Sequence, residues 1–170
     1  MWISFKPNFA QPSGMLNLRL IVIGKYKETY WKQAEAEYIK RLKPYARLVI
    51  HEIAEEPFRN AAERERIQIK EAEKIQKLVP DGSFTIALHE RGRGYTSREL
   101  ADFLSSLSLR GETLTFIIGG PLGLHENLLK TAGCQLSLSP LTFPHQMARV
   151  ALLEQLYRAA TILNGKTYHY

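Results

Sequence analysis

Four residues toward the end of the chain have side chains suited to moving a proton or holding an anion. His145, Arg149, Glu154 and Arg158 lie on or beside a segment with the pattern of a long helix, residues 146–163. A helix turns about 100° per residue, so Glu154 and Arg158 share one face, whereas Arg149 lies about 180° from Arg158. Because a carboxylate and a guanidinium at this spacing also form an ordinary salt bridge, the pattern leaves a catalytic and a structural role open.

The chain ends in Tyr168, His169 and Tyr170, and the imidazole of His169 exchanges protons near neutral pH. Terminal residues of this kind are commonly frayed and inert, so their position alone favours no role. The five histidines show no metal-ligand spacing, and we expect no metal site. Cys134 is the only cysteine, which allows no intramolecular disulfide and favours a reducing, cytoplasmic compartment.

Two glycine-bearing segments resemble phosphate-binding loops. Residues 119–123 (GGPLG) directly follow an apolar stretch, and glycines let a backbone approach a ligand closely. Their spacing does not match the G-x-G-x-x-G pattern of dinucleotide sites, so a plain turn and a ligand loop both stay open. Residues 160–167 (ATILNGKT) resemble a P-loop, but the first position is Ala and the segment follows a helix. We therefore exclude a P-loop.

The pattern of apolar residues predicts the elements that must position these groups. Branched apolar runs indicate buried strands, and apolar residues three or four apart indicate helices. Strands are expected at residues 16–23, 48–53, 84–88, 113–118 and 136–139. Helices are expected at residues 31–42, at 61–78, from a capping box at 96–99 to about 109, from 125 for a few residues, and at 146–163.

Strands that alternate with helices predict an α/β fold, with a mostly parallel sheet covered by helices on both faces. In such sheets a ligand binds beyond the carboxyl ends of the strands. Those ends carry Gly24 and residues 88–92, 119–123 and 139–143. The last helix is apolar around most of its circumference, which requires burial on two sides and suggests a partner subunit.

Composition limits the class of protein. The chain has 170 residues, 45% of them hydrophobic, which fits one globular domain, expected at residues 15–170. Residues 1–14 show no periodicity and are expected to form a flexible extension, with Met15 as an alternative start. The net charge of +6 favours a polyanionic partner. No apolar run approaches the roughly 18 residues of a membrane span.

Several segments together resemble one family. They are LIVIGKYKETYWKQAEAEYIKRL at 20–42, ALHERGR at 87–93, FIIGGPLGL at 116–124 and LSLSPLTFPHQMARVALLEQLYRAATILNGKTYHY at 136–170. In order and spacing they resemble small bacterial methyltransferases of the SPOUT superfamily. Those enzymes use S-adenosylmethionine to modify N3 of a pseudouridine in large-subunit (23S) ribosomal RNA. The resemblance extends over residues 15–170.

The resemblance implies a homodimer and a deep trefoil knot in the carboxyl-terminal part, a rare exception to the rule against knotted chains. The cofactor contacts that it implies coincide with three of the strand ends and are Leu88, Gly119, Leu138, Ser139, Pro140, Leu141, Thr142 and Phe143. The family usually has an acidic residue where this chain has His89. His89 is therefore left out of the expected site.

The resemblance also implies the reaction, a methyl transfer from a sulfonium to a ring nitrogen on the assembled ribosome. A base must accept the proton of that nitrogen, and a cation should stabilise the resulting anion. We expect His169, with Tyr168, to act as base or orienter, and Arg149 or Arg158 to hold the anion. Glu154 would orient an arginine, and the tail of one subunit would meet these residues and His145 of the other.

Other functions remain open. A SPOUT methyltransferase acting on transfer RNA would share the fold and the cofactor. A non-catalytic protein that binds RNA or the ribosome would share the fold alone. A flavodoxin-like nucleotide-binding domain would match the strands and helices, but it does not account for TFPHQMARV or YRAATILNGKTYHY.

Overall fold

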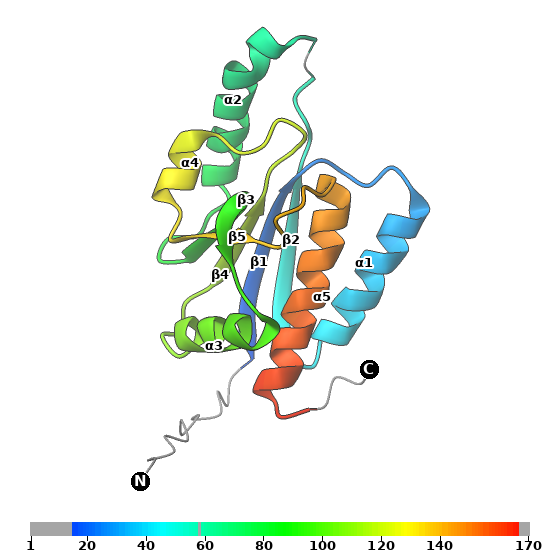
Figure 1. Ribbon diagram of the computed structural model, residues 1–170, viewed down its shortest axis with the longest axis vertical. Helices are drawn as coiled ribbons and strands as arrows, with labels where there is room; N and C mark the ends of the chain where they lie inside the picture. The colour runs from blue at the N-terminus through cyan, green and yellow to red at the C-terminus, as the bar shows by residue number, and fades with distance from the viewer. Residues whose placement is uncertain (1–14, 58, 167–170) are drawn as a thin grey trace.

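The computed structural model describes residues 15–57 and 59–166, so the expected extension at 1–14 lies outside the described part of the chain. Strands alternate with helices along the described residues (Figure 1). The elements are β1 (Leu16–Ile23), α1 (Thr29–Leu42), β2 (Ala46–Ile53), the 3-10 helix η1 (Ala61–Glu63), α2 (Arg64–Gln76), β3 (Phe84–Gly94), α3 (Ser97–Ser108), β4 (Leu114–Ile118), α4 (Glu126–Thr131), β5 (Cys134–Ser137) and α5 (His145–Leu163).

The five strands form one sheet in the order β2-β1-β4-β3-β5, and all neighbouring strands are parallel. One face of the sheet packs against α1, α3 and α5, and the other packs against α2 and α4. Within β1, Leu18 and Leu20 belong to the first core and Ile21 and Ile23 to the second. Because parallel strands are buried on both faces, they show continuous apolar runs. The predicted α/β class and two-sided helix cover are confirmed.

The expectation that β3 ends at residue 88 is wrong, because β3 continues to Gly94. Leu88 and Arg93 both pair with Leu136 of β5, so residues 89–92 bulge out of the ladder between them. Gly92 makes the return possible, since a Cβ there would lie 2.7 Å from the Gln135 backbone. Because the bulge residues are mostly polar, the sequence pattern does not show that the strand continues beyond them.

Other boundaries shift by a few residues. The fifth strand covers residues 134–137 instead of 136–139, and the second helix ends at Gln76, after beginning as a 3-10 turn. The capping box at the start of α3 is confirmed: the Thr96 hydroxyl accepts from the Glu99 N–H, and the Glu99 carboxylate accepts from the Thr96 N–H at 2.7 Å.

The long helix α5 packs against both α1 and α3 on one face of the sheet (Figure 1). Leu152, Leu153 and Leu156 are fully buried there, while Met147 near the start of the helix is 41% exposed. Helices of the same chain therefore cover most of the apolar surface of α5. Its composition by itself does not require a partner subunit.

Candidate functional site

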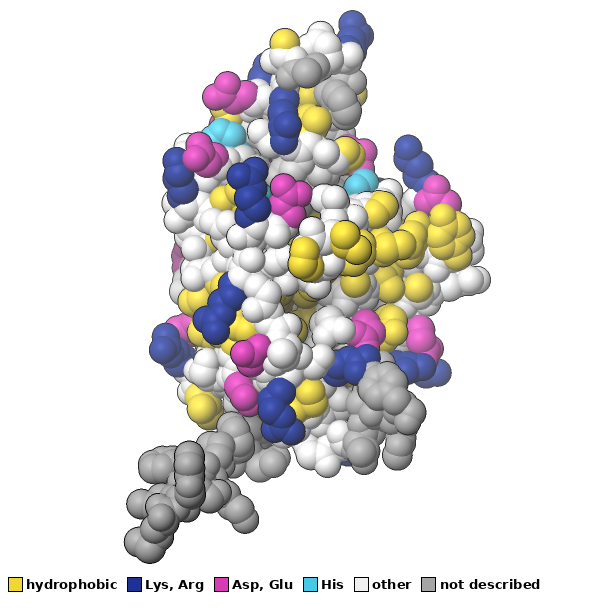
Figure 2. Space-filling model, viewed as in Figure 1, with side chains coloured by type: hydrophobic (Ala, Val, Ile, Leu, Met, Phe, Trp, Pro, Cys, Tyr) yellow, Lys and Arg dark blue, Asp and Glu magenta, His cyan; other side chains and the backbone are white. Residues whose placement is uncertain are grey.

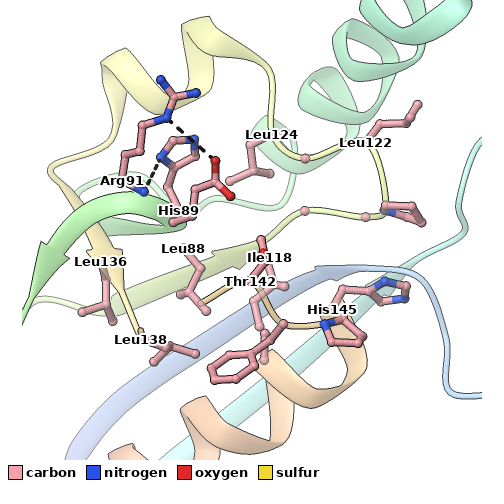
Figure 3. Close-up of a pocket in the computed structure, with 18 of the residues that line it drawn as sticks. Leu88, His89, Arg91, Ile118, Leu122, Leu124, Leu136, Leu138, Thr142 and His145 are labelled. Atoms are coloured by element: carbon pink, nitrogen blue, oxygen red, sulfur yellow. Dashed lines mark hydrogen bonds and ion pairs between the residues drawn. The ribbon is translucent and has the colours of Figure 1, made fainter. Parts of the chain in front are cut away.

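A cavity of about 580 Å³ lies beyond the carboxyl ends of the central strands (Figure 3). This volume falls within the range usual for small-molecule sites. Three segments line most of it: the β3 bulge, the turn after β4, and the loop between β5 and α5. Leu88, Leu136 and Leu138 supply apolar wall on one side, and His145 lies on the other. The cavity lies where an α/β sheet is expected to bind its ligand.

The turn after β4 is compact because of its glycines. The Gly123 N–H donates to the Gly120 carbonyl at 2.9 Å, and Gly123 has φ +76°. A Cβ at Gly119 would lie 2.9 Å from the Gly123 carbonyl carbon, so a side chain there would displace backbone. The glycines therefore keep the backbone of the turn close-packed at the cavity wall.

Helix α2 holds this turn from outside. The Gln68 side-chain amide donates to the Leu122 carbonyl at 2.7 Å, and Arg64 Nη2 donates to the same oxygen at 3.1 Å. Gln68 Nε2 also lies 3.4 Å from the carbonyl oxygens of Gly123 and Leu124. Both side chains line the cavity, and neither was expected from the sequence.

The loop after β5 is tied to the β3 bulge through serine hydroxyls. Ser137 Oγ lies within hydrogen-bond distance of the carbonyls of Glu90, at 3.1 Å, and Ser139, at 2.9 Å. Ser139 Oγ accepts the Leu141 N–H at 3.0 Å and shapes the beginning of the loop. Two of the three lining segments are therefore bonded to each other.

Seven of the eight cofactor contacts implied by the resemblance line the cavity, and Pro140 does not. His89, which the sequence analysis left out, lines it as well, and its Nδ1 accepts the Arg91 N–H at 3.2 Å. Apolar walls, polar groups at the bulge and a close-packed glycine turn fit S-adenosylmethionine, which combines a flat base with a charged amino-acid end. Among the described residues, no three His, Cys, Asp or Glu side chains group closely enough to hold a metal ion.

Comparison with known proteins decides the family. The protein-family model described as "Predicted SPOUT methyltransferase" matches residues 16–169 of this chain. The chain belongs to the SPOUT methyltransferase family. It is 44% identical over 161 residues to "Ribosomal RNA large subunit methyltransferase H" of Carboxydothermus hydrogenoformans, a match that covers 91% of this chain and 99% of the relative. The protein of the same name from Alkaliphilus oremlandii is 46% identical over 158 residues, with the same two coverages.

Solved structures share the fold of this SPOUT methyltransferase at low sequence identity. A probable methylase family protein from Haemophilus influenzae superposes with a TM-score of 0.54 at 16% identity, covering 91% of this chain and 71% of the other. A probable methyltransferase from Bordetella pertussis gives 0.54 at 13% identity, covering 85% and 96%. No helix among the described residues is long and apolar enough to cross a membrane.

The described members of the expected catalytic set do not gather in this cavity. His145 lines it, whereas Glu154 and Arg158 follow along α5 by about 13 and 20 Å at 1.5 Å per residue. Arg158 Nη2 donates to Glu154 Oε1 at 2.5 Å, in a half-buried pair. Tyr168 and His169 lie outside the described residues.

Arg149 turns away from the cavity into a buried acidic cluster. Its guanidinium donates to Glu35 Oε1 of α1 at 2.7 Å and to Glu52 Oε1 of β2 at 2.8 Å. It also lies 4.4 Å from the centre of the Tyr26 ring, and burial raises the pKa of that phenol. Arg149 therefore ties α5 to α1 and β2.

Among the described residues of the expected catalytic set, His145 is the one titratable residue that lines the cavity, and a carboxylate lies beside it. Its Nε2 is 3.2 Å from Glu55 Oε1. Burial lowers the pKa of His145, and the charges of Arg149 and Lys27 lower it further, while Glu55 raises it. The imidazole is therefore neutral, and able to accept a proton, at neutral pH. Glu55 follows β2 by two residues, so the rule on strand ends was the signal that could have found it.

Proposed function

We propose that this chain is the S-adenosylmethionine-dependent methyltransferase that methylates N3 of a pseudouridine in 23S ribosomal RNA, on the assembled ribosome in the cytoplasm. The observation that carries the proposal is the match to relatives named as large-subunit ribosomal RNA methyltransferases, over 91% of this chain and 99% of theirs. The net charge of +6 agrees with an RNA partner.

The cavity supports the cofactor part of the proposal. When bound, S-adenosylmethionine supplies a methyl group on a sulfonium, which is already a good electrophile. Leu88 and Leu138 would cover the adenosyl group, and the backbone turn at Gly119 would lie against it. The protein would contribute mainly proximity and alignment of the two reacting partners. We also propose the family's knot, because the chain returns from β5, at one edge of the sheet, past the cavity to α5.

Removal of the proton from the ring nitrogen needs a base, and two imidazoles are candidates for it. His169, with Tyr168, would act as base or orienter, and His145 already stands at the cavity in its neutral form. Arg149 is bound by two carboxylates, so we assign the stabilisation of the uracil-like anion to Arg158. Glu154, hydrogen-bonded to Arg158, would hold that guanidinium in place.

A second copy of the chain would complete the site. Arg158 lies about 15 Å along α5 from Ala148, the last residue of the helix that lines the cavity, too far to reach it in one chain. Apolar side chains gather on the surface around the beginnings of α1 and α5 (Figure 2). Tyr30 is 60% and Leu141 73% exposed, and Phe143 and Met147 are exposed nearby in the chain. We propose that this apolar surface pairs with the same surface of a second subunit, which brings its tail to the cavity.

The test is methylation of a defined substrate. Ribosomes from a strain that lacks the modification are incubated with the protein and cofactor carrying a labelled methyl group, and the labelled nucleotide is mapped. The proposal predicts a single labelled pseudouridine in 23S RNA. Label in transfer RNA only would favour the transfer-RNA enzyme. Absence of label, together with no heat of cofactor binding in calorimetry, would favour a non-catalytic RNA-binding protein.

A further inference from the structure

Glu55 lies in the segment that follows β2, and its carboxylate reaches across to the beginning of α5. Glu55 Oε1 is 3.2 Å from His145 Nε2, and the side chains are 38% and 17% exposed. The contact joins segments 90 residues apart in the sequence. Neither the family match nor the names of the relatives assign anything to Glu55.

The surrounding backbone leaves room for this contact. Gly24, in the turn after β1, has φ +96°, and a Cβ there would lie 3.0 Å from His145 Nε2 and would also strike the Glu55 carboxylate. On the other side, Glu55 Cγ is 4.0 Å from the Cβ position of Gly120 in the cavity turn. The Glu55 side chain therefore lies between two glycine turns that permit its approach.

The backbone next to Glu55 is held in place. The Glu56 N–H donates to Glu71 Oε1 of α2 at 3.3 Å, and Glu71 is buried. The Glu56 carboxylate forms an ion pair with Lys74 of the same helix. These two contacts anchor the segment, so the direction of the Glu55 side chain is set by α2.

We infer that Glu55 is a positioning residue that orients the His145 imidazole at the edge of the cofactor cavity. The inference rests on the proposed function, because His145 matters to the reaction only if the cavity carries out methyl transfer. Glu55 Oε1 lies 3.2 Å from Nε2 without the geometry of a hydrogen bond. Its negative charge favours the tautomer with the proton on that nitrogen, which leaves Nδ1 free to accept a proton. Glu55 would act through His145 and would not itself touch the reacting atoms.

The charged groups around His145 determine how the inference is tested. They are Glu55 after β2, Arg149 on α5 and Lys27 after β1. Only Glu55 raises the pKa of His145, while burial and both cations lower it. Removing the Glu55 charge should therefore lower the pKa of His145 further. If methyl transfer needs neutral His145, its rate should fall at low pH as His145 is protonated. This acidic limb of the pH–rate profile should then move to lower pH as well.

The experiment uses the full chain and three substitutions. Glu55→Gln removes the charge and keeps the shape. Glu73→Gln, at an exposed position of α2, is the matched control, and His145→Gln assigns the imidazole resonance. Histidine titrations are followed by NMR, and methyl transfer to ribosomes is measured across the same pH range. Glu55→Gln should lower the His145 midpoint by about half a pH unit and shift the acidic limb with it. Glu73→Gln should leave both unchanged.

Each other outcome overturns a specific statement. A His145 midpoint in Glu55→Gln equal to that of the parent protein removes the inference. A lowered midpoint with an unmoved acidic limb removes the positioning role and leaves the methyltransferase intact. If the parent protein transfers no methyl group at all, the proposed function fails. The positioning role in that reaction fails with it, although the NMR titration still reports whether the Glu55–His145 pair exists.

Discussion

Arg149 shows how much a single buried charge can hold together. Its side chain is 5% exposed, and it hydrogen-bonds to carboxylates of α1 and β2 while lying over an aromatic ring of the turn after β1. A buried guanidinium is tolerated in a protein interior only because carboxylates of opposite charge are paired with it. The cluster lies directly behind His145 and so supports the beginning of α5 from inside.

Replacing this arginine should be costly to stability. Arg149→Met leaves Glu35 and Glu52 without their cation, and we expect the free energy of unfolding to fall by about 3–5 kcal/mol. Urea denaturation measures the change. Arg66→Met is the matched control, because Arg66 pairs with Glu63 at the surface, where the loss should stay under about 1 kcal/mol. Equal losses in the two variants would contradict the structural role of Arg149.

Glu71 gives stability a pH dependence of known sign. The residue is 5% exposed, and burial raises its pKa from 4.5, with the charges of Glu55 and Glu56 adding to the effect. The native state therefore binds this proton more tightly than the unfolded chain, and the contribution of Glu71 to stability falls as pH rises above its unfolded value. Burial lowers the pKa of His145, so its contribution has the opposite sign and is lost as pH falls below about 6.5.

Glu71→Gln isolates the first effect. The free energies of unfolding of the variant and the parent protein are measured by urea denaturation at several pH values. The value for the variant should increase relative to that of the parent as the pH rises from about 4.5 toward neutral. Glu73→Gln, at an exposed position of the same helix, is the control and should follow the parent curve. Parallel curves for Glu71→Gln and the parent protein would show that Glu71 titrates alike in both states.

At the scale of elements, the cavity depends on a bulge within one strand and on the connections that follow its two neighbours. The β3 bulge, the turn after β4 and the loop after β5 meet because their strands are parallel neighbours in the order β4-β3-β5. Helix α2, on the opposite face from α5, holds the turn after β4 through Gln68 and Arg64. Both helix layers therefore contribute to the shape of one site.

Gly119→Ala should damage the site with little effect on the rest of the fold. The added methyl group would lie 2.9 Å from the Gly123 carbonyl carbon and 3.0 Å from the Leu124 nitrogen, so the turn must move. We expect cofactor affinity, measured by calorimetry, to fall about tenfold or more, corresponding to at least about 1.4 kcal/mol. Gly94→Ala is the control, since a Cβ there meets nothing within 4 Å. Unchanged affinity in Gly119→Ala would place the cofactor elsewhere.

At the scale of the whole molecule, cofactor binding and catalysis would depend on different parts of the chain. All the described residues that line the cavity precede residue 149, whereas His169, one of the two proposed bases, would act in the cavity of the other subunit. Such a division separates the two activities experimentally.

A chain shortened after Thr167 should lose methyl transfer to ribosomes and keep cofactor affinity, because it lacks Tyr168 and His169 but retains every residue of the cavity. Labelled-methyl transfer and calorimetry measure the two properties. A chain that begins at Met15 is the control for shortening and should keep both. Unchanged turnover in the chain shortened after Thr167 would remove the tail from the mechanism.

Much of this protein follows from its sequence for local reasons. Apolar runs predict strands such as β1 and β4 because a parallel strand buries both its faces. Glycines after β4 predict a close-packed turn, and the end of each strand predicts one edge of the sheet for the ligand. These features depend on residues that are close in the sequence, so the residue pattern is enough to predict them.

Contacts between distant segments were decided only by the tertiary structure. Glu35 and Glu52 lie 114 and 97 residues from Arg149 in the chain, and Glu55 lies 90 residues from His145. The bulge in β3 likewise depends on its register against β5. Helical spacing placed Arg149 on a face, but it could not reveal the buried carboxylates opposite, because charge matching in an interior depends on which segments the sheet brings together.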